Sequence, residues 1–117
     1  MPQGPKLIAR GGGSINPRVL AEQLHIPLSE LAELIGVSRK MLAAEPLGKK
    51  GRGALLPLVR LLTQATEIAG SLERAVLWFK YAPIVPLGTK TAMEHVRDGN
   101  IAAVHGHLEN VYNGVYV

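Results

Sequence analysis

Apolar residues recur along this chain at the three- and four-residue spacing of an α-helix, and this periodicity restricts the fold more than any other feature. The members are Leu28, Leu31, Ala32 and Ile35 in one segment, Leu55, Leu58, Val59, Leu62, Ala65 and Ala69 in a second, and Ile101, Val104, Leu108 and Val111 in a third. Each set would lie along one buried face of a helix. Leu, Ala, Val and Ile also outnumber the aromatic residues, which make up 4% of the chain. We therefore predict an all-α fold.

Composition excludes several classes of protein. A length of 117 residues corresponds to one domain or two very small ones. The chain has no cysteine, which excludes disulfides and thiolate metal sites. No apolar run reaches the roughly 20 residues that cross a bilayer, and the N-terminus lacks the apolar segment of a secretory signal. We therefore expect a cytoplasmic protein without a membrane partner.

The N-terminal residues 1–16 are predicted to form a flexible arm. They contain Pro2, Pro5 and three consecutive glycines, which make regular structure costly. A first helix is expected from Pro17, with Asn16 as its N-cap and proline at the first helical position. It should end just before Pro27, because the residue preceding a proline disfavours the helical conformation.

The spacing around Gly36 is that of a helix-turn-helix. A helix over residues 28–35 is followed by Gly36 and then by a short helix over residues 39–44. Ala32 is small enough for two helices to cross, Gly36 tolerates the positive φ of a tight turn, and Leu42 would hold the second helix on the first. An ordinary pair of helices meeting at a corner is the alternative, since its turn favours glycine too.

Cations gather in and after the second of these helices. They are Arg39, Lys40, Lys49, Lys50, Arg52 and Arg60, with Glu45 the only acid among them. Such a patch is the electrostatic footprint of a nucleic-acid binder, although a solvated surface can have the same composition. The glycine-rich segment 45–53 is interpreted as a mobile basic loop that reaches phosphates, or that links two parts of the chain. The predicted DNA-binding residues are Ser38, which would cap the second helix, and Arg39, Lys40, Lys49, Lys50 and Arg52.

A long helix is predicted over residues 55–69. Pro57 would lie in its first turn, where a missing N–H costs nothing. Gly70 and Ser71 would end this helix and cap the next one, whose apolar residues are Leu72, Ala75, Val76 and Phe79. The apolar faces of the two helices would form a core or a dimer surface. Trp78 is interpreted first as a core residue and second as a contact for a partner.

No catalytic or metal-binding constellation is visible. His105 and His107 are two residues apart, so their side chains on a helix would point about 200° apart. His25 and His95 have no carboxylate or cysteine at ligand spacing, and no nucleophile–base motif such as G-x-S-x-G occurs. We therefore expect a protein that is not an enzyme and that holds neither a metal nor a cofactor.

The C-terminal third presents an ordered series of unlike features. In order they are Trp78, a proline-bracketed segment over residues 83–86, the block Leu87-Gly88-Thr89-Lys90-Thr91-Ala92, a short helix, a break at Gly99, a last helix and a Gly-Val-Tyr end. This series resembles the toxin-binding domain of the Xre/MbcA/ParS antitoxins. These antitoxins belong to bacterial toxin–antitoxin pairs whose toxins carry the RES domain. Since family members also have an N-terminal helix-turn-helix part, the resemblance covers nearly all of the chain after residue 17.

The resemblance implies three parts and a role for the C-terminal end. The parts are a flexible arm over residues 1–16, a helix-turn-helix region with its basic loop over residues 17–53, and a toxin-binding domain over residues 54–117. In the family, the antitoxin neutralises a NAD-consuming toxin by covering its NAD-binding pocket, partly with this end. The residues predicted to bind the toxin are Gly114, Val115, Tyr116 and Val117. A C-terminal end folded back onto its own core is the alternative.

The implied partners are a RES-domain toxin, operator DNA and a second copy of the chain, as a homodimer within a larger toxin–antitoxin complex. Two other functions fit the same residues. One is a free-standing helix-turn-helix repressor whose C-terminal half is a dimerisation domain. The other is a structural adaptor with a degenerate helix-turn-helix that binds no DNA.

Overall fold

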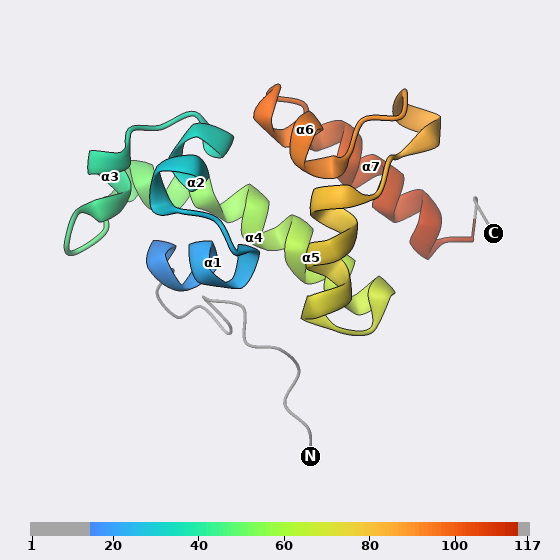
Figure 1. The fold of residues 1–117 in the computed structure, drawn as a ribbon, viewed down its shortest axis with the longest axis horizontal. Helices are drawn as coiled ribbons and strands as arrows, with labels where there is room; N and C mark the ends of the chain where they lie inside the picture. The colour runs from blue at the N-terminus through green and yellow to red at the C-terminus, as the bar shows by residue number, and fades with distance from the viewer. Residues whose placement is uncertain (1–14, 115–117) are drawn as a thin grey trace, which may run out of the picture. The chain divides into compact units, whose positions relative to one another are not determined.

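The computed structural model describes residues 15–114, and within that range the chain forms seven α-helices and one short 3-10 helix (Figure 1). They are α1 (Pro17–Leu24), α2 (Leu28–Ile35), α3 (Arg39–Ala43), α4 (Lys49–Ala69), α5 (Leu72–Tyr81), the 3-10 helix η2 (Val85–Leu87), α6 (Ala92–Arg97) and α7 (Ile101–Tyr112). The only β-type pairing in this range is an isolated bridge between Pro83 and Thr91. The predicted all-α class is therefore confirmed. None of the described helices has the length and apolar character needed to cross a bilayer.

The chain divides into two compact units. The first ends at Val59 and the second begins at Arg60. The division lies inside α4, whereas the sequence suggested a boundary after residue 53. Each unit is described below by itself.

Helix α1 begins where the sequence predicts it. The Oδ1 atom of Asn16 accepts hydrogen bonds from the backbone N–H groups of Arg18 (3.0 Å) and Val19 (3.3 Å). These two donors have no carbonyl partner within the first turn, so the asparagine cap stabilises the start of the helix. His25 ends the helix in the left-handed conformation, with φ of 56°, as expected from the proline at position 27.

Helix α2 packs against both α1 and α3, and its buried face is wider than a single stripe. Leu28, Leu31 and Ala32 are buried as predicted. Leu34 is also buried, with 1% of its surface exposed, whereas Ile35 is partly exposed. The prediction for Ile35 is therefore only partly right, because a helix that contacts neighbours on two sides buries residues outside one i, i+3, i+4 set.

The start of α4 differs from the prediction. The segment 45–53 is not a loop throughout, since α4 begins at Lys49. Gly51 lies buried in its first turn, where an added Cβ would lie 2.8 Å from Cδ1 of Leu47 and 3.5 Å from Cγ of Met41. The missing side chain thus lets Leu47 and Met41 lie close to the backbone of this turn, which is helical although glycine has a low helix propensity. Pro57 consequently lies inside the helix and not in its first turn.

The second unit is built on α5, α6 and α7, which pack in sequence against one another, and on the C-terminal part of α4. Its largest fully buried side chain is Phe79, with none of its surface exposed. Trp78 is only partly buried. The prediction that Trp78 is a core residue is thus wrong in part, because the buried sector of α5 centres on Ala75, Val76 and Phe79. In α7 the buried stripe is reduced to Val104 and Leu108.

Burial lowers the pKa of His107 in α7 below its ordinary value, because the charged ring loses hydration. Above about pH 6.5, the ordinary pKa of histidine, the ring is neutral in both folded and unfolded protein. As the pH falls below that value, the unfolded protein takes up the proton first, so the free energy of unfolding should decrease. We expect urea unfolding at about pH 7.5 and about pH 5.5 to show this decrease in the wild type and less of it in His107→Gln. An equal decrease in both proteins would contradict the assignment.

Candidate functional site

The first unit carries a basic surface on the starts of two helices. Its members are all exposed: Arg39 and Lys40 at the start of α3, and Lys49, Lys50 and Arg52 in the first turn of α4. A Cβ on Gly51 of α4 would lie 3.5 Å from Cγ of Met41 in α3, so the two groups lie near each other within the unit. Acidic side chains, which the positive end of the helix dipole favours, are absent from the first turn of α4. The surface therefore concentrates positive charge where a phosphate could be held.

Ser38, the sixth residue of the predicted DNA site, caps α3. Its Oγ accepts a hydrogen bond of 3.1 Å from the backbone N–H of Met41, as the sequence predicts for an N-cap. The hydroxyl proton can still be donated to an acceptor such as a phosphate oxygen. Before α3, Gly36 adopts a positive φ of 76°, which is the conformation expected for the turn between α2 and α3.

The basic side chains of α4 therefore stand on a helix, and the prediction that they lie on a mobile loop is wrong. On a helix their backbone positions are fixed before any ligand arrives, so ordering them costs less conformational entropy than ordering a loop. Lys49 and Arg52 are three residues apart and share one face, while Lys50 lies about 100° from Lys49 and about 160° from Arg52 around the helix.

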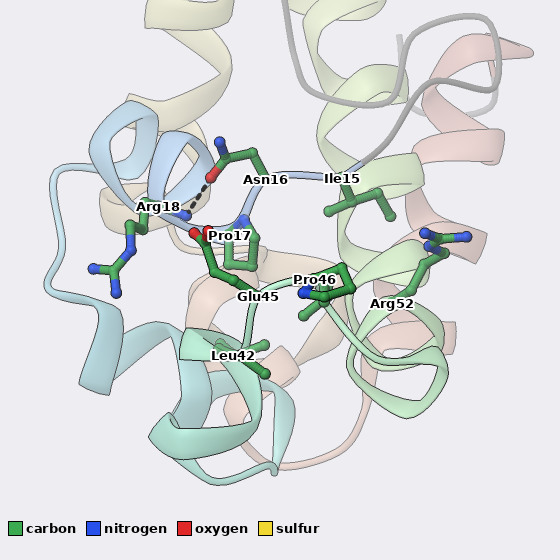
Figure 2. A pocket seen from close by; sticks show the side chains of 10 residues that line it. Ile15, Asn16, Pro17, Arg18, Leu42, Glu45, Pro46 and Arg52 are labelled. Carbon is green, nitrogen blue, oxygen red and sulfur yellow. Dashed lines mark hydrogen bonds between the residues drawn. The ribbon is translucent and has the colours of Figure 1, made fainter.

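A pocket of about 250 Å³ lies beside this surface (Figure 2). Its lining residues are Ile15, Asn16, Pro17, Arg18, Leu42, Ala44, Glu45, Pro46, Leu47 and Arg52. Figure 2 shows Arg18 and Arg52 on opposite sides, with Glu45 the acid between them. The volume is below the range of about 300–1,000 Å³ that is common for ligand pockets, and the lining includes the buried apolar residues Ile15 and Leu42.

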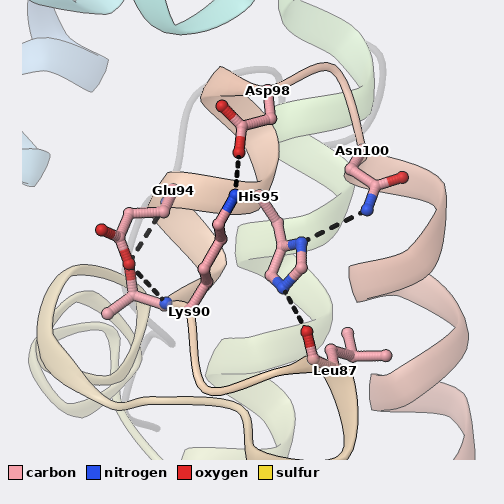
Figure 3. Close-up of polar contacts among 7 residues, drawn as sticks. Leu87, Lys90, Glu94, His95, Asp98 and Asn100 are labelled. Carbon is pink, nitrogen blue, oxygen red and sulfur yellow. Dashed lines mark hydrogen bonds and ion pairs between the residues drawn. The ribbon is translucent and has the colours of Figure 1, made fainter.

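In the second unit, hydrogen bonds tie the segment after α5 to α6 (Figure 3). Buried His95 donates from Nε2 to the backbone carbonyl of Leu87 (3.2 Å), and its Nδ1 accepts from Nδ2 of Asn100 (3.3 Å). Both ring nitrogens are thus used within the fold, which explains a buried histidine without a metal. Among the described residues, no group of three or more His, Asp or Glu side chains could hold a metal ion.

Two further interactions lie at the ends of α6. Thr91 and Glu94 form a capping box, in which each side chain accepts from the backbone N–H of the other, at 3.2 Å and 2.9 Å. Lys90 and Asp98 form an ion pair of 2.7 Å on the surface. The hydrogen bond and opposite charge of the partner raise the pKa of Lys90 and lower the pKa of Asp98. The block of residues 87–92 that carries the family resemblance thus leads into α6, and Leu87, Lys90 and Thr91 form hydrogen bonds with residues of this helix and its C-cap.

The predicted toxin-binding residues lie mostly beyond the described part of the chain. Gly114 is described: it is exposed, has φ of 80°, and its N–H donates to the carbonyl of Val111 (3.0 Å). Val115, Tyr116 and Val117 lie outside the described residues. Their role stays a prediction.

Exposed apolar side chains on the second unit were not singled out from the sequence. They are Leu77 (58% exposed), Tyr81 (67%), Val85 (71%) and Tyr112 (71%). Leu77 and Tyr81 are four residues apart on α5 and therefore share a face. Their spacing from the buried set Ala75, Val76 and Phe79 is the signal that could have identified them, because a helical wheel puts them on the opposite side.

Comparison with known proteins shows the fold. No protein-family profile and no curated protein matches the chain. Among solved structures, a chain of the M. tuberculosis MbcT–MbcA toxin–antitoxin complex is similar, with a TM-score of 0.63 and 20% sequence identity. The similarity covers 87% of this chain and 95% of that chain. The resemblance inferred from the sequence is thereby confirmed at the level of the fold.

Proposed function

We propose that this protein is the antitoxin of a toxin–antitoxin pair. It acts by binding and not by catalysis, in the cytoplasm, and its toxin is a NAD-consuming protein with a RES domain. The observation that supports this most is the fold shared with a chain of a toxin–antitoxin complex along nearly the full length of both chains. The series of features in the C-terminal third supports the RES-domain partner in particular.

In this proposal, residues 114–117 cover the NAD-binding pocket of the toxin. Two valines and a tyrosine form an apolar segment that suits a concave site, and Tyr112 in the preceding helical turn is itself 71% exposed. Exposed aromatic side chains are frequent anchors of protein–protein contacts. The segment would compete with NAD for the same space.

The test uses the RES-domain toxin that we expect the adjacent reading frame to encode. We expect the two proteins to co-purify, and we expect stoichiometric addition of this chain to stop NAD consumption by the toxin in a direct assay of NAD. A chain carrying Lys40→Gln, an exposed change in the first unit, serves as a handling control. The proposal is refuted if no complex forms and NAD loss continues at the same rate.

The second part of the proposal is that the basic surface binds operator DNA, so that the antitoxin represses its own genes as a dimer. Ser38, Arg39 and Lys40 would face the major groove, and Lys49, Lys50 and Arg52 would contact phosphates. The exposure of all six residues supports this assignment. Two half-sites would supply the specificity that one short helix lacks.

Replacing Lys49, Lys50 and Arg52 together by glutamine should weaken DNA binding chiefly through lost counterion release. Each lost phosphate contact should reduce the slope of log affinity against log salt by about 0.9, so the triple variant should lose nearly 3. Fluorescence anisotropy on the upstream DNA, from about 50 to about 200 mM salt, measures this slope. Arg97→Gln, which removes an exposed cation from α6 in the second unit, should leave the slope unchanged.

The same experiments separate the alternatives. DNA binding without a toxin complex would favour a free-standing repressor whose C-terminal half dimerises. Absence of DNA binding at low salt, with toxin neutralisation intact, would favour an adaptor or antitoxin whose helix-turn-helix serves assembly alone.

A further inference from the structure

Helix α5 displays an apolar face with charges on both sides. Leu77 is 58% exposed and Tyr81 is 67% exposed, although α5 also contributes fully buried residues to the core of its unit. Glu73 and Arg74 are exposed one turn before Leu77, and Lys80 lies one turn after it. Nζ of Lys80 lies 5.6 Å from the centroid of the Tyr81 ring, so these two side chains are held close together. We call these five residues the α5 face.

The positions on this face follow from helix geometry. With about 100° per residue, Glu73 and Lys80 lie about 40° and about 60° to one side of Leu77. Arg74 and Tyr81 lie about 60° and about 40° to the other side. The rise of about 1.5 Å per residue places Glu73 about 6 Å before Leu77 and Lys80 about 4.5 Å after it. Arg74 lies about 4.5 Å before Leu77 along the helix axis, and Tyr81 lies about 6 Å after it.

Consider a two-fold axis that passes beside Leu77, perpendicular to α5 and within the contact plane. Rotation about this axis makes the second helix antiparallel to the first. Residues on one side of Leu77 in the first copy then meet the residues on that same side in the second copy. Lys80 of a second copy then arrives about 1.5 Å from the height of Glu73, on the same side of the contact. Tyr81 of the second copy likewise arrives beside Arg74. The first pair is an ion pair and the second a cation–π pair. Each forms twice because the contact is isologous.

From this self-complementarity we propose that the α5 face is the homodimer interface, formed by antiparallel pairing of α5 with α5 of a second copy around Leu77. The inference deepens the second-copy partner of the proposed function and rests on that function only for the role of the dimer. The charges favour a second copy of this chain as the partner, because every charged side chain of the α5 face then meets a complementary group on the α5 face of the other copy.

The direction of the pairing follows from the helix dipoles. A two-fold axis along α5 would pair the helices in parallel, with Glu73 beside Arg74 and Lys80 beside Tyr81 of the second copy. Parallel helices place like ends of their dipoles side by side, whereas antiparallel helices place opposite ends together. The antiparallel arrangement is therefore favoured, and its partner pairs differ from those of the parallel one.

The pairing should be modest in strength. One short helix from each copy buries less than the roughly 1,200–2,000 Å² of a standard stable interface. We therefore expect a dissociation constant on the order of micromolar, visible by sedimentation equilibrium between about 1 and about 100 µM chain.

Charge reversal tests the geometry directly. Glu73→Lys alone places two lysines opposite each other at both symmetric positions, and Lys80→Glu alone places two glutamates there. Each variant should therefore dimerise about tenfold more weakly or worse. An equimolar mixture of the two should form a heterodimer of about wild-type strength, because opposite charges again face each other at both positions. Glu109→Lys, an exposed charge reversal on α7, should leave dimerisation unchanged.

A change at the symmetry axis gives a second readout. Leu77→Glu should leave the fold intact, since the side chain is mostly exposed in the single chain, and should abolish dimerisation because two carboxylates meet at the axis. Circular dichroism with thermal unfolding verifies the fold of every variant. Toxin neutralisation and DNA binding are measured on the same wild-type preparations, so the proposed function succeeds or fails separately.

Loss of the dimer in each single variant with recovery in the mixture supports the interface. A wild type that is monomeric at about 100 µM overturns it, as do single variants that dimerise normally. A mixture that does not associate also overturns it. That result is expected of a parallel pair, in which position 73 of the Glu73→Lys copy faces Arg74 of the second copy and like charges repel each other. If Leu77→Glu retains the dimer but loses the toxin, the face belongs to the toxin and the inference is wrong.

Discussion

A chain that ends at Asn113 should fold normally and yet inhibit the toxin at least about a hundredfold less well than the full chain. Burial of one large apolar side chain contributes about 1.5–3 kcal/mol, and each 1.4 kcal/mol is a factor of about ten in affinity. Loss of the contacts of one or two of the removed side chains is therefore enough for this effect. Gly114, the described residue among those removed, is exposed, and its backbone N–H donates to the carbonyl of Val111 in the last turn of α7.

The measurement is the concentration of antitoxin that halves the rate of NAD consumption by the toxin. A second variant, in which Val115, Tyr116 and Val117 are all replaced by serine, keeps the length of the chain and removes only its apolar character. Both variants should lose inhibition while their circular dichroism and unfolding midpoints match the wild type. Full inhibition by the shortened chain would show that the toxin is held elsewhere on the protein.

Phe79→Ala should destabilise the second unit by about 3–5 kcal/mol, the usual cost of removing a fully buried aromatic ring. Phe79 is the largest fully buried side chain among the described residues, with none of its surface exposed. Since the free energy of unfolding of small domains is only about 5–15 kcal/mol, this change should remove a large part of it. Urea unfolding followed by far-UV circular dichroism measures the loss.

Trp78→Ala is the matched comparison, since the neighbouring residue is also aromatic but only partly buried. We expect a smaller loss of about 1–2 kcal/mol, because part of the ring already contacts water in the folded protein. A loss for Trp78→Ala equal to that for Phe79→Ala would mean that the tryptophan is the true anchor of the core. Comparison with the shortened chain separates unfolding from a specific effect on binding. Phe79→Ala should impair toxin inhibition because it destabilises the protein, whereas the shortened chain should impair inhibition without any loss of stability.

The helix starts that could be read from the sequence are those made by one local side chain. Asn16, Ser38, Ser71 and Thr91 each accept a hydrogen bond from a backbone N–H two or three residues later. Such a bond depends only on a few consecutive residues, so the sequence contains all the information needed to predict it. The positive φ of Gly36 between α2 and α3 was predictable for the same reason.

The candidate site was predictable as a set of residue types but not as a structure. The cations at positions 39–52 are evident from the sequence, yet three of them stand on α4 and not on a loop. The α5 face could not be predicted, because the sequence does not distinguish the exposed Leu77 and Tyr81 from buried apolar residues until the buried side of α5 is known.

By itself the sequence determined the all-helical class, the capped helix starts and the positions of the charges, because periodicity and capping act over a few residues. The tertiary structure alone decided that α4 begins at Lys49, that Phe79 and not Trp78 anchors the second unit, and that Leu34 is buried beside a partly exposed Ile35. These outcomes depend on which neighbour covers each face. Gly51 shows the reason most clearly, since a residue that disfavours helix in isolation is retained in one where Leu47 and Met41 leave little room for a side chain.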